Sequence, residues 1–299
     1  MTRASTSILL AMAGTVTVSF LYGQLINLNS STIVAGSEET KIQQLLYEQM
    51  LKIDKLLNTS QSGSQPLDDT ADYIDLFIRT AKAQSPITDK VTTHTYQVMY
   101  GQYLLPYYYK NPKMKMLEIG LGCGMEYGPG ASVALYKKLF PEAELWEADF
   151  ETNCVEKSKK KGQLDGINTL TGDQGNDTVL DGWIETSGGN FDVVIDDGGH
   201  QNCQIWHSFM KLWPTVKPGG LYFIEDMQVA KQPDYRNAHT NKCDGNLIVP
   251  EKLKLFFDNL IYDVNRKSDL QFMFCQSEAC VLGKSNGGGT HVNALTTIN

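Results

Sequence analysis

The stretch at residues 116–125, MLEIGLGCGM, places three glycines within five positions directly after an apolar run. Glycine lets the backbone turn sharply and approach a ligand closely, so the pattern predicts a strand followed by a ligand-binding turn. A dinucleotide fingerprint would carry its third glycine at position 125, which is Met125 here. Glu118, at the end of the apolar run, is also foreign to that fingerprint and would suit a cationic or amino-bearing ligand.

On both sides of this turn, short apolar runs alternate with helical stretches. From residue 115 they are MKMLEIG, ASVALYKKLF, AELWEAD, NCVEKSKKKG, INTLTGD, FDVVIDDGG, QIWHSFMKLWPTV and GGLYFIED. This alternation predicts a doubly wound α/β fold, with helices on both faces of a mostly parallel seven-stranded sheet. LQFMFC and ACVLGK, joined by QSE, predict a closing antiparallel hairpin. We expect the domain to span residues 69–299.

Polar residues end the next two predicted strands. In such a sheet the ligand lies beyond the carboxyl ends of the strands. Asp149, in WEADF, has two acceptor oxygens that suit the vicinal hydroxyls of a ribose. Asp173 and Gln174, in TGDQGN, could hydrogen-bond an adenine amino group. Each residue taken alone is equally well explained as a helix cap or a solvated turn residue.

The motifs LEIGLGCG, EAD, TGDQ and FDVVIDDGGH…KPGGLYFIED, in this order, resemble those of class I S-adenosylmethionine-dependent methyltransferases. The resemblance covers about residues 89–226. It implies S-adenosylmethionine as the cofactor. By this likeness the methionine part of the cofactor contacts Glu118, Gly120, Gly122 and Gly124, the ribose contacts Asp149, and the adenine contacts Asp173 and Gln174.

DDGGH and IEDMQ, at the ends of the next two strands, resemble the metal-binding motifs of macrolide-sugar O-methyltransferases and their cephalosporin-hydroxylase-like relatives. The resemblance implies that Asp197, Glu225 and Asp226 bind Mg²⁺ or a similar divalent cation, and that His200 is the general base. Converging carboxylates need a cation between them, and oxygen ligands favour Mg²⁺. The alternatives are surface ion pairs, a structural histidine, and Asp196 as the ligand in place of its neighbour.

These features predict a metal-dependent O-methyltransferase acting on a hydroxyl of a sugar or glycosylated metabolite. The alternatives are a non-methylating, hydroxylase-like relative and a membrane-tethered cofactor-binding module without turnover. ITDKVTTHTY, ahead of the glycine turn, resembles a segment that these enzymes carry, so His94 either touches the site or packs among the tyrosines. A net charge of −8 argues against a nucleic-acid partner.

Residues 1–37 are predicted to be a membrane anchor or signal segment. Ser7 to Ile26 is uncharged and mostly apolar, and ~20 such residues cross a bilayer. Arg3 on the short side favours a cytoplasmic N-terminus, with the catalytic domain in the lumen of the endoplasmic reticulum or Golgi. Secretion after signal cleavage is the alternative. Residues 38–68 are predicted to be a helical stem and linker, and the stem could pair with a second copy.

Sequons and cysteines fit translocation without requiring it. Glycosylation triplets begin at Asn29, Asn58 and Asn176. Cys275 and Cys280 could form a local disulfide in an oxidising lumen, and reduced, half-buried thiols are an equal alternative.

Overall fold

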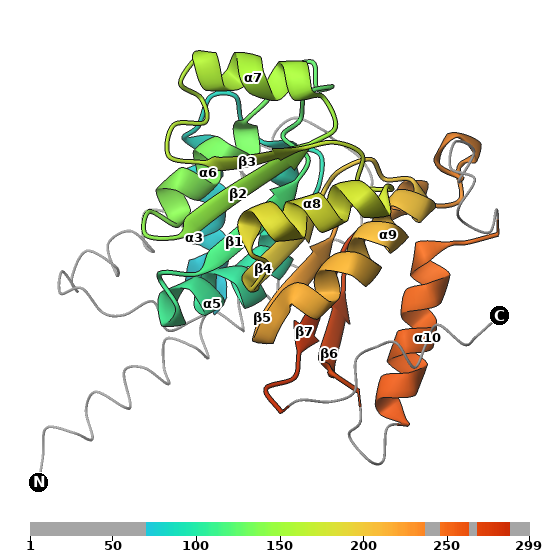
Figure 1. The fold of residues 1–299 in the computed structure, drawn as a ribbon. Helices are drawn as coiled ribbons and strands as arrows, with labels where there is room; N and C mark the ends of the chain where they lie inside the picture. Colours follow the sequence, from blue (N-terminus) through green and yellow to red (C-terminus); the bar gives the residue numbers. More distant parts are fainter. Residues whose placement is uncertain (1–69, 237–245, 263–267, 288–299) are drawn as a thin grey trace, which may run out of the picture. The chain divides into compact units, whose positions relative to one another are not determined.

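A seven-stranded mixed sheet organises residues 70–236, 246–262 and 268–287, which the computed structural model describes (Figure 1). The strand order is β3-β2-β1-β4-β5-β7-β6. The strands are β1 Lys115–Ile119, β2 Glu144–Asp149, β3 Asn168–Thr171, β4 Phe191–Asp196, β5 Val216–Ile224, β6 Leu270–Cys275 and β7 Cys280–Lys284. The first five strands pair in parallel, and β7 pairs antiparallel with both β5 and β6. The predicted α/β fold and its closing hairpin are confirmed.

Helices cover both faces of the sheet. They are α3 Thr70–Lys82, α4 Gln97–Met99, α5 Leu105–Lys110, α6 Ala131–Leu139, α7 Thr152–Lys160, α8 Asp177–Ser187, α9 Asn202–Leu212 and α10 Val249–Ile261. Figure 1 shows α8 and α9 on one face and α3 and α5 on the other. Short helical turns are η1 Asp89–Val91, η2 Tyr100–Leu104, η3 Trp213–Thr215, η4 Met227–Val229 and η5 Pro233–Tyr235.

The two faces of the sheet pack into two separate cores. Along β4, Val193 joins the core with α3, α5 and α6, whereas Val194 joins the core with α8, α9 and α10. Successive side chains of a strand point to opposite faces, so a strand that is covered on both sides is largely apolar. All six residues of β4 are buried, including the two aspartates at positions 192 and 196.

The strand order places the candidate site. The chain leaves β1 toward β2 on one side, whereas β4 returns on the other side of β1. Such a change of direction opens a crevice at the carboxyl ends of the two central strands. Gly120 follows β1 and Asp197 follows β4, and the Asp197 backbone N–H donates to the Ile119 carbonyl at 2.9 Å.

Several predictions about the chain outside this fold stay untested. The anchor or signal segment at 1–37, the stem and linker at 38–68, and the sequons at Asn29 and Asn58 lie outside the described residues. Within the described ranges, no helix has the length and apolar character needed to cross a bilayer. Asn176 lies inside them, where its side chain caps α8 by accepting a hydrogen bond from the Thr178 N–H at 3.0 Å.

Disulfide bonds link cysteines of the described fold. Cys275 and Cys280 form the local bridge that the sequence left open. A second bridge, which the sequence did not indicate, joins Cys123 to Cys154 across 31 residues.

Candidate active site

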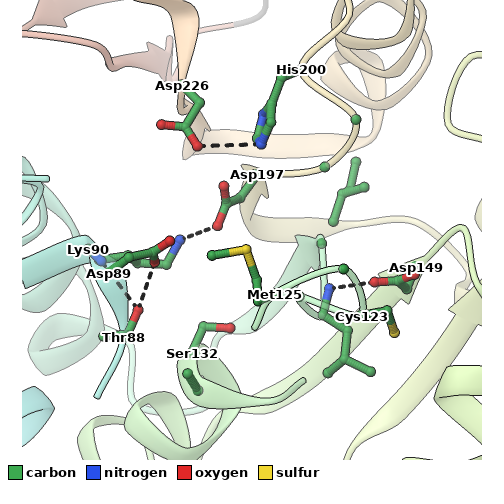
Figure 2. Close-up of a pocket in the computed structure, with 18 of the residues that line it drawn as sticks. Thr88, Asp89, Lys90, Cys123, Met125, Ser132, Asp149, Asp197, His200 and Asp226 are labelled. Carbon is green, nitrogen blue, oxygen red and sulfur yellow. Dashed lines mark hydrogen bonds and ion pairs between the residues drawn. The ribbon is translucent and has the colours of Figure 1, made fainter. Parts of the chain in front are cut away.

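A cavity of about 730 Å³ opens at the carboxyl ends of the five parallel strands, β1 to β5 (Figure 2). Its walls come mainly from the segment around η1, the glycine turn, and the loops that follow β2, β3, β4 and β5. Eight residues with predicted roles line it: Gly120, Gly122, Gly124, Asp149, Gln174, Asp197, His200 and Asp226. Three do not line it: Glu118, Asp173 and Glu225.

The three glycines of the turn differ in what they require. Gly120 has φ +114°, and a Cβ there would lie 2.0 Å from the Asp197 carbonyl oxygen. Gly122 has φ +80°, and its Cβ would meet the Met125 side chain at 3.3 Å. A Cβ on Gly124 would meet nothing within 4 Å. Gly120 therefore permits the contact between the central strand ends, whereas Gly124 borders open space.

Asp149 ties the glycine turn to the end of β2. Its carboxylate accepts hydrogen bonds from the Leu121 N–H at 3.0 Å and the Glu151 N–H at 2.8 Å. A carboxylate has about four lone-pair sites, so ribose hydroxyls can still bind it. The predicted ribose role is compatible with this geometry.

The Cys123–Cys154 disulfide makes a second, covalent link between the same two segments. Cys123 belongs to the glycine turn and lines the cavity, while Cys154 lies in the first turn of α7. The disulfide therefore joins the glycine turn directly to the segment after β2, and both are predicted to hold the cofactor. A binding loop that is ordered in advance loses less entropy when its ligand binds.

Replacing this disulfide is expected to weaken cofactor binding. The Cys123→Ser, Cys154→Ser double variant should bind S-adenosylmethionine about 3- to 10-fold more weakly, because the free turn must be ordered on binding. Isothermal titration calorimetry measures the change. The matched control is the Cys275→Ser, Cys280→Ser variant, whose disulfide closes the β6–β7 hairpin. Equal affinities for both variants and the wild type would contradict this role.

Glu118 lies beneath the cavity floor. It is fully buried, and its carboxylate accepts from the Ser132 hydroxyl at 2.5 Å and the Tyr136 hydroxyl at 3.2 Å. Burial raises the pKa of Glu118, although the nearby Lys90 ammonium acts to lower it. Ser132 does line the cavity, so the structure allows Glu118 to act on a ligand through that hydroxyl.

Asp173 and Gln174, the residues predicted to contact the adenine, form hydrogen bonds with other residues of the protein. The Gln174 amide donates to the Asp196 carboxylate at 2.8 Å and accepts from the Gly199 N–H at 2.8 Å. One Asp173 carboxylate oxygen accepts from the Gly175 N–H at 2.8 Å.

Asp196 is 1% exposed, so it is Asp197, and not its neighbour, that faces the cavity.

Asp197, His200 and Asp226 converge on one point of the cavity. One donor atom from each residue lies within 4.8 Å of the other two. His200 Nε2 is 3.4 Å from Asp226 Oδ2, as Figure 2 shows. Burial acts to raise the pKa of Asp226, but His200 and the Tyr96 hydroxyl outweigh it and lower this pKa below its usual value. Asp226 is therefore ionised at neutral pH.

The backbone at this point is strained. His200 and Asp226 both have φ +55°, which residues with a side chain adopt at a cost of about 1–2 kcal/mol each. His200 Nδ1 is buried without a hydrogen-bond partner in the described structure. Strain and unpartnered polar atoms of this kind concentrate at functional sites.

Glu225 interacts with Lys90 and Tyr100. It is 1% exposed, with Oε2 2.6 Å from the Lys90 ammonium and Oε1 accepting from the Tyr100 hydroxyl. The structure does not bring it into the group of Asp197, His200 and Asp226. Its role as a metal ligand therefore stays a prediction.

Two residues of the segment ahead of the sheet contribute to the site. Lys90 received no role from the sequence, because a lone lysine in a polar stretch is usually solvated. Lys90 pairs with Asp197 and Glu225, which lie 107 and 135 residues later in the chain, so no pattern in the neighbouring sequence indicates the pairing. His94 lines the cavity and also stacks on Tyr96 with ring centroids 4.8 Å apart, so both of its alternative roles are seen.

Comparison with known proteins identifies relatives. No family model matches the chain. It is 38% identical over 141 residues to mycinamicin VI 2''-O-methyltransferase from Micromonospora griseorubida, covering 46% of this chain and 33% of that protein. Demethylmacrocin O-methyltransferase from Streptomyces fradiae is 37% identical over 129 residues, which cover 42% of this chain and 31% of that protein. The chain is related to the macrolide-sugar O-methyltransferases.

A solved structure extends this relationship. The MycE methyltransferase of the mycinamycin biosynthetic pathway, in complex with Mg, SAH and mycinamycin VI, has a TM-score of 0.56 and 26% sequence identity. The match covers 86% of this chain and 65% of that one. The aligned segments span about a third of the length of the curated relatives. The resemblance to this class I methyltransferase family, first seen in the motifs, is confirmed.

Proposed function

We propose that the protein is an S-adenosylmethionine-dependent, Mg²⁺-dependent O-methyltransferase that acts on a sugar hydroxyl of a glycosylated small molecule. The observation that carries this proposal is the convergence of Asp197, His200 and Asp226 in the same cavity as the glycine turn and Asp149. Related methyltransferases whose names specify sugar positions support the acceptor class.

The cofactor would occupy the side of the cavity formed by the glycine turn and the end of β2. Gly122 and Gly124 leave the backbone accessible there, and Asp149 offers its remaining lone pairs to the ribose. Ser132 presents a hydroxyl backed by buried Glu118. These groups would hold the methyl donor.

The opposite side has donors that fit a divalent cation. Asp197 and Asp226 supply carboxylate oxygens, and Mg²⁺ in proteins is commonly bound by one or two carboxylates together with water or substrate. When bound, such an ion lowers the pKa of a coordinated hydroxyl and orients it.

His200 is the residue we assign as the general base. Its Nδ1 is buried, so we assign proton transfer to Nε2, which faces Asp226 at 3.4 Å. The ionised Asp226 carboxylate stabilises the imidazolium that forms. S-adenosylmethionine, when bound, would supply the methyl group, and these residues would promote its transfer mainly by positioning and deprotonating the acceptor hydroxyl.

Methyl transfer should require both the sugar and the metal. With labelled S-adenosylmethionine, we expect transfer to members of a glycoside panel, none to the matched aglycones, and loss of transfer with EDTA that added Mg²⁺ restores. A cofactor that binds but is never consumed would instead favour a hydroxylase-like relative or a binding module.

We also propose that the catalytic domain faces the lumen of the secretory pathway. The Cys123–Cys154 and Cys275–Cys280 disulfides support an oxidising compartment. A C-terminal tag should therefore resist protease in intact microsomes and become sensitive when detergent is added. Sensitivity without detergent would place the domain in the cytosol.

A further inference from the structure

A buried ammonium group lies among three carboxylates that come from three strand ends. Lys90 Nζ is 2.6 Å from Asp197 Oδ2, 2.6 Å from Glu225 Oε2 and 3.4 Å from Glu118 Oε1. Lys90 is 1% exposed. It enters from η1, ahead of the sheet, and meets Asp197 at the edge of the cavity (Figure 2).

Lys90 is paired with the carboxylates of Asp197 and Glu225 at this buried position. Charge-assisted hydrogen bonds of this length are among the stronger ones in proteins, and a buried ammonium has no water to replace them. Lys90 therefore holds its partners in one arrangement.

The consequence falls on Asp197. Its Oδ2 lies against the Lys90 ammonium, whose positive charge opposes a second cation at that oxygen, whereas its Oδ1 makes no hydrogen bond or ion pair within the described residues. The Asp197 side chain is 20% exposed and lines the cavity. Asp197 thus offers one oxygen, and not two, to a ligand in the cavity.

We propose that Lys90 is a positioning residue that restricts Asp197 to a single ligand oxygen and thereby favours Mg²⁺ over Ca²⁺. Mg²⁺ requires near-octahedral geometry with single oxygens, whereas Ca²⁺ accepts six to eight ligands and readily binds both oxygens of a carboxylate. This inference rests on the proposed function, because it requires that the site bind a divalent cation.

The test compares the affinities of the two ions in charge-balanced variants. Lys90→Met alone would leave Glu225 buried without its partner and could unfold the protein. The Lys90→Met, Glu225→Gln double variant removes both charges and frees Asp197. Glu225→Gln alone is the reference, because it has the same residue at position 225 and Lys90 still holds Asp197. Mg²⁺ and Ca²⁺ are each titrated by calorimetry into protein saturated with S-adenosylhomocysteine.

We expect the ratio of Mg²⁺ to Ca²⁺ association constants to be about tenfold lower in the double variant than in Glu225→Gln, since Ca²⁺ gains a ligand oxygen. A change in net charge affects the binding of both divalent ions alike. A change in the ratio of their association constants therefore reports a change in the arrangement of the ligand oxygens.

A double variant that still binds S-adenosylhomocysteine but has the same ratio as Glu225→Gln would overturn the role of Lys90 and leave the proposed function standing, provided that the wild type binds Mg²⁺. A wild-type protein that binds neither ion would overturn both this inference and the metal-dependent mechanism. The two failures are therefore distinguishable.

Discussion

His200→Gln is expected to lower kcat for methyl transfer by about 10³-fold, within the usual range for loss of a general base. Glutamine is polar and close in size but cannot accept the acceptor's proton at neutral pH. Cofactor affinity should stay within about threefold, because His200 lies beside Asp197 and Asp226 and not at the glycine turn. Steady-state kinetics with the best glycoside of the panel, together with calorimetry of S-adenosylhomocysteine, measure both quantities.

The matched control is His207→Gln. His207 is also a half-buried histidine paired with an aspartate, 2.7 Å from Asp177, but it lies on α9 and does not line the cavity. Its replacement should leave kcat within about twofold. If His200→Gln kept more than a tenth of the wild-type kcat, the proton would have to leave by another route.

The second large effect is expected for Gly120→Ala, which should reduce the free energy of unfolding by about 3 kcal/mol or more. The new Cβ would lie 2.0 Å from the Asp197 carbonyl oxygen, and φ +114° is unfavourable for any residue with a side chain. Relief of this overlap requires β1 and β4 to separate at the carboxyl ends that form the site. Urea denaturation measures the stability, and calorimetry measures the accompanying loss of cofactor affinity.

Gly124→Ala is the control within the same turn. A Cβ there meets nothing within 4 Å, and the residue does not have a positive φ. Its stability should change by less than about 1 kcal/mol. Equal losses for the two variants would show that Gly120 is not distinguished by its contact with the Asp197 backbone.

Much of the fold could be predicted from local patterns. The apolar runs of β1, β4 and β5 predict strands covered on both faces, and the intervening helical spacings predict parallel connections. These patterns can be recognised within a few neighbouring residues, because the direction of the side chain in a strand alternates with every residue. The closing hairpin followed from two apolar runs with a three-residue connection.

Which acid faces the cavity could not be predicted in the same way. Asp196 and Asp197 are adjacent, yet one is buried against Gln174 and Ser208 while the other reaches the cavity. Where a strand ends and the chain turns, the strict alternation of side chains ends as well. Glu225 and Asp226 repeat this case at the next strand end.

The sequence by itself determined the order of the strands along the chain, the glycine turn and the set of acids and histidine at the strand ends. Only the tertiary structure decided that Lys90 neutralises Glu225 and holds Asp197, and that Cys123 is joined to Cys154. The physical reason is distance along the chain. Strand and turn propensities act over a few residues, whereas a buried charge is balanced by whatever partner the folded chain brings within about 3–4 Å.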